Sequence, residues 1–198
     1  MTLFQLALTF FLVTNPIGNT PTILALVKNI DFKRQRLILI REAFFSFLIA
    51  LFFQYAGEQF LSLIKVHDYS MTLCGGTLLL VVALQMIFPK HEEASGKTLT
   101  REPFVVPIAT PLLSGPGVLT LIMLFSKQEA DNLKITSAIV LAWAGVMFVL
   151  AMAPYLQKLL GKRGLTALEQ LMGMLLAVIG VGMLAMGVRM FIDFLGKV

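Results

Sequence analysis

Six apolar stretches, each long enough to cross a lipid bilayer as a helix, dominate this sequence of 198 residues. A transmembrane helix needs about 20 predominantly apolar residues. With 58% hydrophobic and only 14% charged residues, the chain carries more apolar surface than one water-soluble core could bury. We therefore predict an all-α integral membrane protein with six transmembrane helices. The predicted spans cover residues 2–27, 37–64, 70–88, 104–126, 133–159 and 167–194.

Local sequence patterns argue against a transmembrane β-barrel and against a removable leader. A barrel would show segments of about ten residues in which apolar and polar side chains alternate. Stretches such as GGTLLLVVALQMIF do not alternate, so helices are favoured. No basic residue precedes the first span and no small-residue cleavage pattern follows it, so we expect this span to remain in the mature protein.

The distribution of basic residues predicts the orientation in the membrane. Eleven of the 16 Lys and Arg residues lie in or beside the first, third and fifth predicted loops, and five lie on the other side. Cytoplasmic loops carry the excess of Lys and Arg, so these loops are predicted to be cytoplasmic and both termini to lie outside the cytoplasm. Topology thus explains the net charge of +5, and we expect a lipid bilayer and no nucleic acid as the partner.

An internal repeat relates the two halves of the chain. LVTNPIG at 12–18 aligns with LLSGPGV at 112–118, and each motif lies near the centre of the span that opens a set of three. Because three is odd, the two sets must enter the membrane from opposite sides. This is the inverted-topology repeat of many secondary transporters. The predicted units are a first three-helix repeat at 1–88, a cytoplasmic linker at 89–103, and a second, inverted three-helix repeat at 104–198.

The aligned prolines predict that the first and fourth helices are broken at mid-membrane. Proline lacks the amide hydrogen and its ring clashes with the carbonyl four residues earlier, so each proline should free a backbone acceptor. Unpaired backbone at membrane depth is tolerated only where protein buries it or where it lines a wet cavity, so both breaks must face inward. Asn15 or Thr20 can cap the first restarted helix, and Ser114 or Gly115 can cap the second.

The two breaks together favour a zwitterionic ligand. A restarted half-helix presents free amides and the positive end of its dipole, about half an elementary charge, which suits a carboxylate. The freed carbonyls suit an ammonium group or a cation. Glycines at the breaks favour a ligand with a short side chain, or else they only supply the φ angles of a broken helix. The predicted substrate-binding residues are Asn15, Pro16, Gly18, Asn19, Thr20, Ser114, Gly115, Pro116 and Gly117.

The motifs TNPIGNTP and PLLSGPGVL, set in six predicted spans, resemble the MarC (UPF0056-type) family of prokaryotic inner-membrane proteins, whose relatives include small neutral amino acid transporters. The resemblance covers nearly the whole chain and implies the cell inner membrane as the location. Relatives often carry Asp where this chain has Asn15, and an amide cannot carry a proton at that position. The residues that carry the resemblance are Asn15, Pro16, Gly18, Asn19, Gly115 and Pro116.

We expect a secondary transporter of small neutral amino acids, such as glycine, alanine, serine or threonine, that works by alternating access. The alternative is a channel for water or a small neutral solute with an aquaporin-like pair of half-helices; it ranks second because the second motif lacks the asparagine and no arginine lies at mid-depth. No converging nucleophilic, titratable or metal-ligating residues are recognisable, so we expect no enzyme activity, catalytic residue, metal or cofactor. Transport direction, proton or sodium coupling, and homo-oligomerisation stay open.

Other polar residues in the predicted spans have mainly structural interpretations. Arg41 and Glu42 are expected to form a local pair, with a gate contact as the alternative. Gln54 and Gln85 are expected to join helices by hydrogen bonds, with a position in a cavity as the alternative. Trp143 is expected to pack, or else to form a cavity wall. One face of the last span carries small residues that let another helix approach closely: Gly173, Ala177, Gly180 and Gly187.

Overall fold

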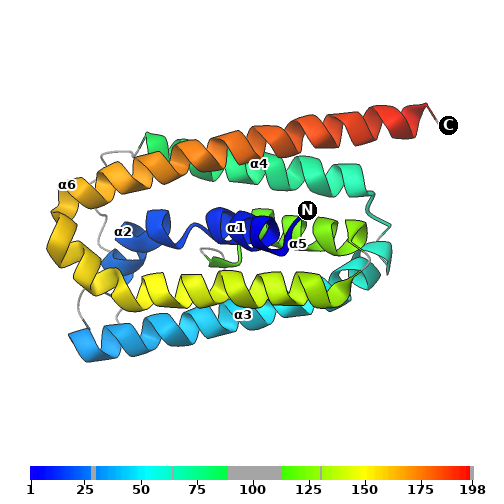
Figure 1. Cartoon of the computed structure of the whole chain (residues 1–198). Helices are drawn as coiled ribbons and strands as arrows, with labels where there is room; N and C mark the ends of the chain where they lie inside the picture. The colour runs from blue at the N-terminus through cyan, green and yellow to red at the C-terminus, as the bar shows by residue number, and fades with distance from the viewer. Residues whose placement is uncertain (28–29, 64, 89–112, 130, 197–198) are drawn as a thin grey trace.

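The computed structural model describes residues 1–27, 30–63, 65–88, 113–129 and 131–196. The predicted linker at 89–103 and the first part of the fourth predicted span, 104–112, lie outside the described residues. All regular elements in the described part are helices, as the sequence predicts. They are α1 (Leu3–Thr14), α2 (Pro16–Leu26), α3 (Phe32–Leu63), α4 (Asp68–Ile87), α5 (Pro116–Gln128) and α6 (Asn132–Leu195) (Figure 1).

Four helical segments of the described part are long and apolar enough to cross a membrane: α3, α4 and the two arms of α6, Asn132–Leu156 and Arg163–Leu195. The arms meet at Gly161, whose backbone is not helical (φ 62°, ψ −176°), a conformation that glycine adopts without a Cβ clash. Four of the six predicted spans are therefore present as candidate membrane helices. The first predicted span is divided between α1 and α2, and α5 is the second half of the fourth.

The helices form three layers, with the two broken spans in the middle (Figure 1). The first arm of α6 and α3 lie on one side of α1, α2 and α5, and the second arm of α6 lies with α4 on the other side. At one end of the bundle, the Val27 carbonyl after α2 accepts a hydrogen bond from Gln35 Nε2 near the start of α3 (3.0 Å). At the other end, Lys127 of α5 pairs with Asp68 at the start of α4 (2.8 Å). The half-helices α2 and α5 thus run in opposite directions.

Close helix contact joins α4 to the second arm of α6. A Cβ built on Gly76 would lie 2.9 Å from the carbonyl oxygen of Gly180, and one built on Gly180 would lie 3.1 Å from that of Gly76. Gly173 and Gly187 are equally close to α4. The predicted small-residue face is therefore confirmed, and its partner belongs to the same chain.

The apolar side chains divide between the core and the outer surface. Phe10, Ile139 and Trp143 are almost completely buried, and they belong to a cluster that fills the space between the layers. Large apolar side chains such as Phe148 and Val178 are about 70% exposed (69% and 72%) on the outside of the bundle. This arrangement suits a protein whose outer surface faces lipid.

Candidate functional site

Asn15 forms the first break between α1 and α2. Its backbone lies in the left-handed region (φ 50°, ψ 53°), which Asn tolerates better than most residues with a side chain. Its N–H donates to the Phe11 carbonyl (3.0 Å) and ends α1, and its Oδ1 accepts from the Gly18 N–H (3.1 Å) and starts α2. Of the two predicted caps, the structure therefore uses Asn15, with Pro16 at the first helical position. The helix continues through Pro21, and the Thr20 hydroxyl donates to the Pro16 carbonyl (2.8 Å).

Side chains of the first motif satisfy part of the backbone that the break leaves unpaired. Asn19 Nδ2 donates to the Thr14 carbonyl at the end of α1 (3.1 Å). Asn15 Nδ2 reaches across to the Met86 sulfur of α4 (3.3 Å). Two neighbouring asparagines thus hold the break in shape and tie it to α4.

The second break is anchored by a buried hydroxyl network. Ser114 Oγ lies 2.7 Å from Ser46 Oγ and donates to the Ser46 carbonyl (3.0 Å) in α3. Trp143 Nε1, in the first arm of α6, donates to the same Ser46 hydroxyl (3.1 Å). All three residues are at least 99% buried. Ser114 therefore links the start of the second half-helix to two other helices.

Gly115 takes the N-cap position of α5, and it provides no side-chain cap. The first intrahelical bond runs from the Leu119 N–H to the Gly115 carbonyl (3.1 Å). The amides of Gly117 and Val118 precede that bond, so they belong to the group of helix N–H donors that need partners from outside the helix. They lie where the dipole of α5 has its positive end.

One cavity of about 480 Å³ is lined by both breaks. It brings together five of the predicted site residues, whereas Pro16, Gly18, Thr20 and Ser114 are not part of its lining. The breaks contribute Val13, Asn15, Asn19, Thr22, Gly115, Pro116, Gly117 and Val118; α4 contributes Leu78, Leu79, Val82, Gln85 and Met86; and α6 contributes Glu169 and Leu176.

The glycines of the breaks are explained by packing against α4. Among described glycines only Gly161 has a positive φ, so the explanation that Gly18 and Gly117 supply special φ angles is wrong. A Cβ on Gly18 would lie 2.5 Å from Met86 Cε, and one on Gly117 would lie 2.5 Å from Leu79 Cγ. The missing side chains make room for protein atoms, so these glycines do not by themselves set a size limit for a ligand.

Among the described residues, Glu169 is the one charged residue in the cavity lining, and it was not predicted from the sequence. It lies at the beginning of the last predicted span, a position where a carboxylate does not by itself indicate a function. A helical spacing could have found it, because Glu169, Gly173, Leu176 and Gly180 fall on one face of the helix. The next residue, Gln170, donates to the Ile87 carbonyl at the end of α4 (3.3 Å). Ile87 and Leu79 are eight residues apart in α4, which is about 12 Å along the helix axis. Glu169 therefore lies about that far from Leu79 and from the start of α5.

The remaining polar residues of the predicted spans divide as follows. Arg41 Nη2 pairs with the fully buried Glu42 (2.9 Å), which confirms the local pair. Trp143 is buried and bonded to Ser46, and Gln54 joins α3 to α6 through the Asn132 carbonyl (3.1 Å). Gln85 takes its alternative position in the cavity lining.

Comparison with known proteins identifies relatives over almost the full chain. A family profile described as "MarC family integral membrane protein" matches residues 1–192. The UPF0056 inner membrane protein YhgN of Escherichia coli strain K12 is 35% identical over 187 residues, which cover 93% of this chain and 95% of that protein. A UPF0056 membrane protein of Buchnera aphidicola subsp. Schizaphis graminum is 33% identical over 179 residues, 90% of this chain and 91% of the relative.

A UPF0056 membrane protein of Chlamydia trachomatis is 35% identical over 179 residues, 88% of this chain and 87% of that protein. No solved structure matches the chain. The matches and the helices together make this an inner-membrane protein with several membrane-spanning helices. The chain belongs to the MarC family of integral membrane proteins.

Proposed function

We propose that this chain is a secondary transporter that moves small neutral amino acids, such as glycine, alanine, serine or threonine, across the inner membrane by alternating access. One observation carries the proposal: both helix breaks line a single cavity of about 480 Å³. Binding sites at paired helix breaks are typical of transporters built from repeats. Both import and export, driven by a sodium or a proton gradient, are compatible with this proposal.

The polar end of the cavity suits a zwitterion. The amides of Gly117 and Val118 and the positive end of α5 favour a carboxylate. Asn15 and Asn19 also line this cavity, and their side chains carry no net charge. Since water takes about 30 Å³ per molecule in the liquid, the cavity has room for a small amino acid together with several waters.

The apolar side of the cavity suits the side chain of such a solute. It is formed by α4 residues, including Leu79, Val82 and Met86. Ligand sites of this kind combine a mainly apolar lining with a few polar groups that orient the ligand. The proposed amino acid would therefore point its side chain toward α4 and its charged groups toward the breaks.

The proposed architecture is two inverted three-helix repeats, 1–88 and 104–198, joined by a cytoplasmic linker at 89–103. Its support is that α2 and α5 both begin at a proline, lie in the middle layer and run in opposite directions (Figure 1). Rocking of one repeat against the other would open the cavity to each side in turn. The excess of basic residues in the odd loops places both termini outside the cytoplasm in this proposal.

A channel for water or a small neutral solute is the second candidate, because opposed half-helices that meet at their N-termini also occur in channels. Counterflow in proteoliposomes separates the two. A transporter accelerates uptake of labelled alanine when unlabelled alanine is present inside, because the loaded site returns faster than an empty one; a channel does not. Labelled leucine and phenylalanine test the expected preference for small side chains.

The variant Asn15→Gly is the matched test of the site. Glycine keeps the left-handed backbone at this position but removes the amide from the cavity. We expect loss of counterflow in Asn15→Gly and normal counterflow in Thr77→Ala, whose hydroxyl only bonds its own helix at Leu73. Normal alanine counterflow in Asn15→Gly would show that the substrate does not bind at this break. If the wild type lets solute through but shows no counterflow, the channel is favoured.

A further inference from the structure

Two buried oxygen atoms that lack a hydrogen-bond partner line the same small pocket at the end of the bundle opposite the α6 bend. In the described part of the chain these atoms are Gln54 Oε1 and Ser126 Oγ. The pocket has a volume of about 130 Å³ and lies between the C-terminal part of α3, the last turn of α5 and the start of α6. Buried polar groups in proteins are almost always paired, so two orphans in one pocket need an explanation.

The orientation of the Gln54 amide is fixed by its neighbours. Its Nε2 donates to the Asn132 carbonyl (3.1 Å) and to Thr136 Oγ1 (2.8 Å), which uses both of its hydrogens. Thr136 donates its own hydrogen to the Asn132 carbonyl (2.9 Å), so it accepts from Gln54. The remaining atom, Oε1, is an acceptor on a residue that is only 6% exposed, and it needs a hydrogen-bond donor or a cation as its partner.

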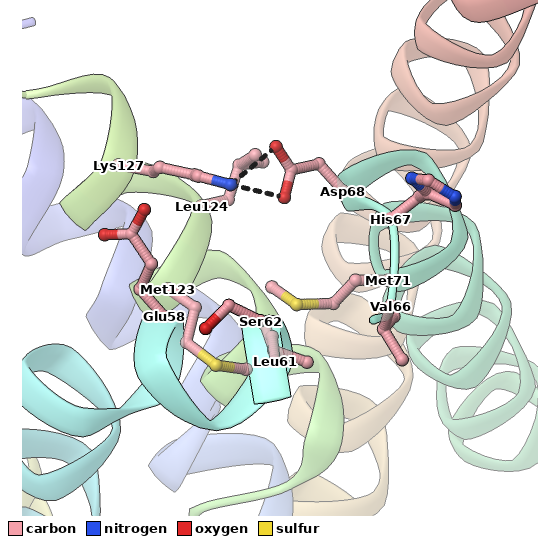
Figure 2. Close-up of a pocket in the computed structure, with 10 residues that line it drawn as sticks. All are labelled: Glu58, Leu61, Ser62, Val66, His67, Asp68, Met71, Met123, Leu124 and Lys127. Carbon is pink, nitrogen blue, oxygen red and sulfur yellow. Dashed lines mark hydrogen bonds and ion pairs between the residues drawn. The ribbon is translucent and has the colours of Figure 1, made fainter. Parts of the chain in front are cut away.

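The surroundings of the pocket supply negative charge. The Glu58 carboxylate lines it, and no described residue forms an ion pair with Glu58. Lys127 lines it as well, but its ammonium group is bonded to both carboxylate oxygens of Asp68 (2.8 and 2.9 Å), as Figure 2 shows from the adjoining pocket. The last turn of α5 adds the negative end of a helix dipole.

We propose that this pocket binds a monovalent metal cation, with Na⁺ as the ion tested, through Gln54 Oε1, Ser126 Oγ and the Glu58 carboxylate. Oxygen donors suit hard cations, and one carboxylate with neutral oxygens balances a single positive charge. Water molecules in the 130 Å³ pocket complete the coordination.

Such a site would sit at the opposite end of α5 from the proposed substrate. The 13 residues of α5 form a rigid rod of about 20 Å, with Gly117 in the cavity and Ser126 at the cation pocket. The positive dipole end then faces the substrate carboxylate and the negative end faces the cation. Coupling of cation binding to uptake through α5 rests on the proposed transport function, whereas the cation site itself does not.

The binding test measures thermal stability of the full chain in detergent against NaCl, KCl and choline chloride at constant ionic strength. A cation that binds only the folded state raises the midpoint with concentration. We expect the rise to be larger with NaCl than with choline chloride in the wild type. Ser126→Ala removes a hydroxyl that makes no hydrogen bond, so it should fold normally and raise the half-maximal Na⁺ concentration about tenfold, as should Glu58→Gln.

Ser62→Ala is the control, because Ser62 lies near the same end of α3 but bonds to the Gln59 carbonyl (2.8 Å) and lines only the adjoining pocket. It should respond to Na⁺ as the wild type does. Equal midpoints in NaCl and choline chloride, or a wild-type Na⁺ response in both Ser126→Ala and Glu58→Gln, would overturn the site and leave ordered water as the occupant of the pocket.

A second measurement separates the site from transport. Alanine uptake is compared in proteoliposomes with and without an inward Na⁺ gradient. Uptake that depends on Na⁺ and is lost in Ser126→Ala supports coupling through α5. A Na⁺-specific rise in thermal stability without any alanine uptake supports the cation site and contradicts the transport function. Alanine uptake without any effect of Na⁺ on thermal stability supports the transport function and contradicts the cation site.

Discussion

Replacement of Asn15 by Ala and by Gly separates the structural role of this residue from its role in the cavity. The Asn15 side chain caps α2 through the Gly18 N–H (3.1 Å), and its backbone is left-handed. Loss of a cap to Ala costs about 1 kcal/mol. The left-handed conformation costs a further 1–2 kcal/mol, roughly, for an ordinary L-residue. Asn15→Ala should therefore lower the free energy of unfolding by about 2–3 kcal/mol.

Glycine avoids both costs almost entirely, because it adopts the left-handed conformation and loses only a few tenths of a kcal/mol, roughly, as a cap. The assay is the thermal midpoint in detergent, where about 2–4 °C is expected per kcal/mol for a chain of this size. Asn15→Ala should melt about 4–12 °C below the wild type and Asn15→Gly within about 1 °C of it. Both should lose alanine counterflow equally. A midpoint of Asn15→Gly as low as that of Asn15→Ala would refute the reasoning from backbone conformation.

Three further outcomes are expected. Ser114→Ala removes two buried hydrogen bonds to Ser46 and should lower stability by about 1–3 kcal/mol with a shift of Trp143 fluorescence; an unchanged midpoint and spectrum would contradict the network. Gly180→Val inserts atoms against the backbone of α4 and should cost about 1–3 kcal/mol. Gly182→Ala, with open space around its Cβ, should be neutral or slightly stabilising, because alanine favours a helix more than glycine does; similar midpoints for the two variants would contradict the packing. Alkaline phosphatase fused to the C-terminus should be active in cells, and green fluorescent protein fused there should not fluoresce. The reverse pattern would place the C-terminus in the cytoplasm.

Features with a local chemical cause could be predicted from the sequence. The break follows from proline chemistry and capping preference, and the structure uses Asn15, one of the two predicted caps. The contact of the last span with another helix follows from glycines at helical spacing, and the structure shows that contact with α4. In both cases the information lies within a single helix or its cap.

Features that depend on distant residues could not be predicted in the same way. Ser114 fits a capping pattern, but its hydroxyl meets Ser46, 68 residues earlier in the chain, and no local pattern encodes that meeting. Gly117 fits the pattern of a broken helix, but a glycine is needed there because a Cβ would clash with Leu79 in α4. Glu169 enters the cavity only because the second arm of α6 packs along α4. The lining of the cavity is therefore a property of tertiary packing.

Substrate protection of one engineered cysteine at each break tests the central claim most directly. The single native cysteine, Cys74, is exposed and is first replaced by Ser. Asn19→Cys and Val118→Cys then place one thiol on each break, both in the cavity lining. Labelling by a small methanethiosulfonate reagent is measured with and without alanine, and Val66→Cys, in the exposed loop between α3 and α4, serves as the control. A single amino acid site between the breaks predicts slower labelling at both cavity positions and no change at the control; labelling unaffected by alanine at both cavity positions would contradict it.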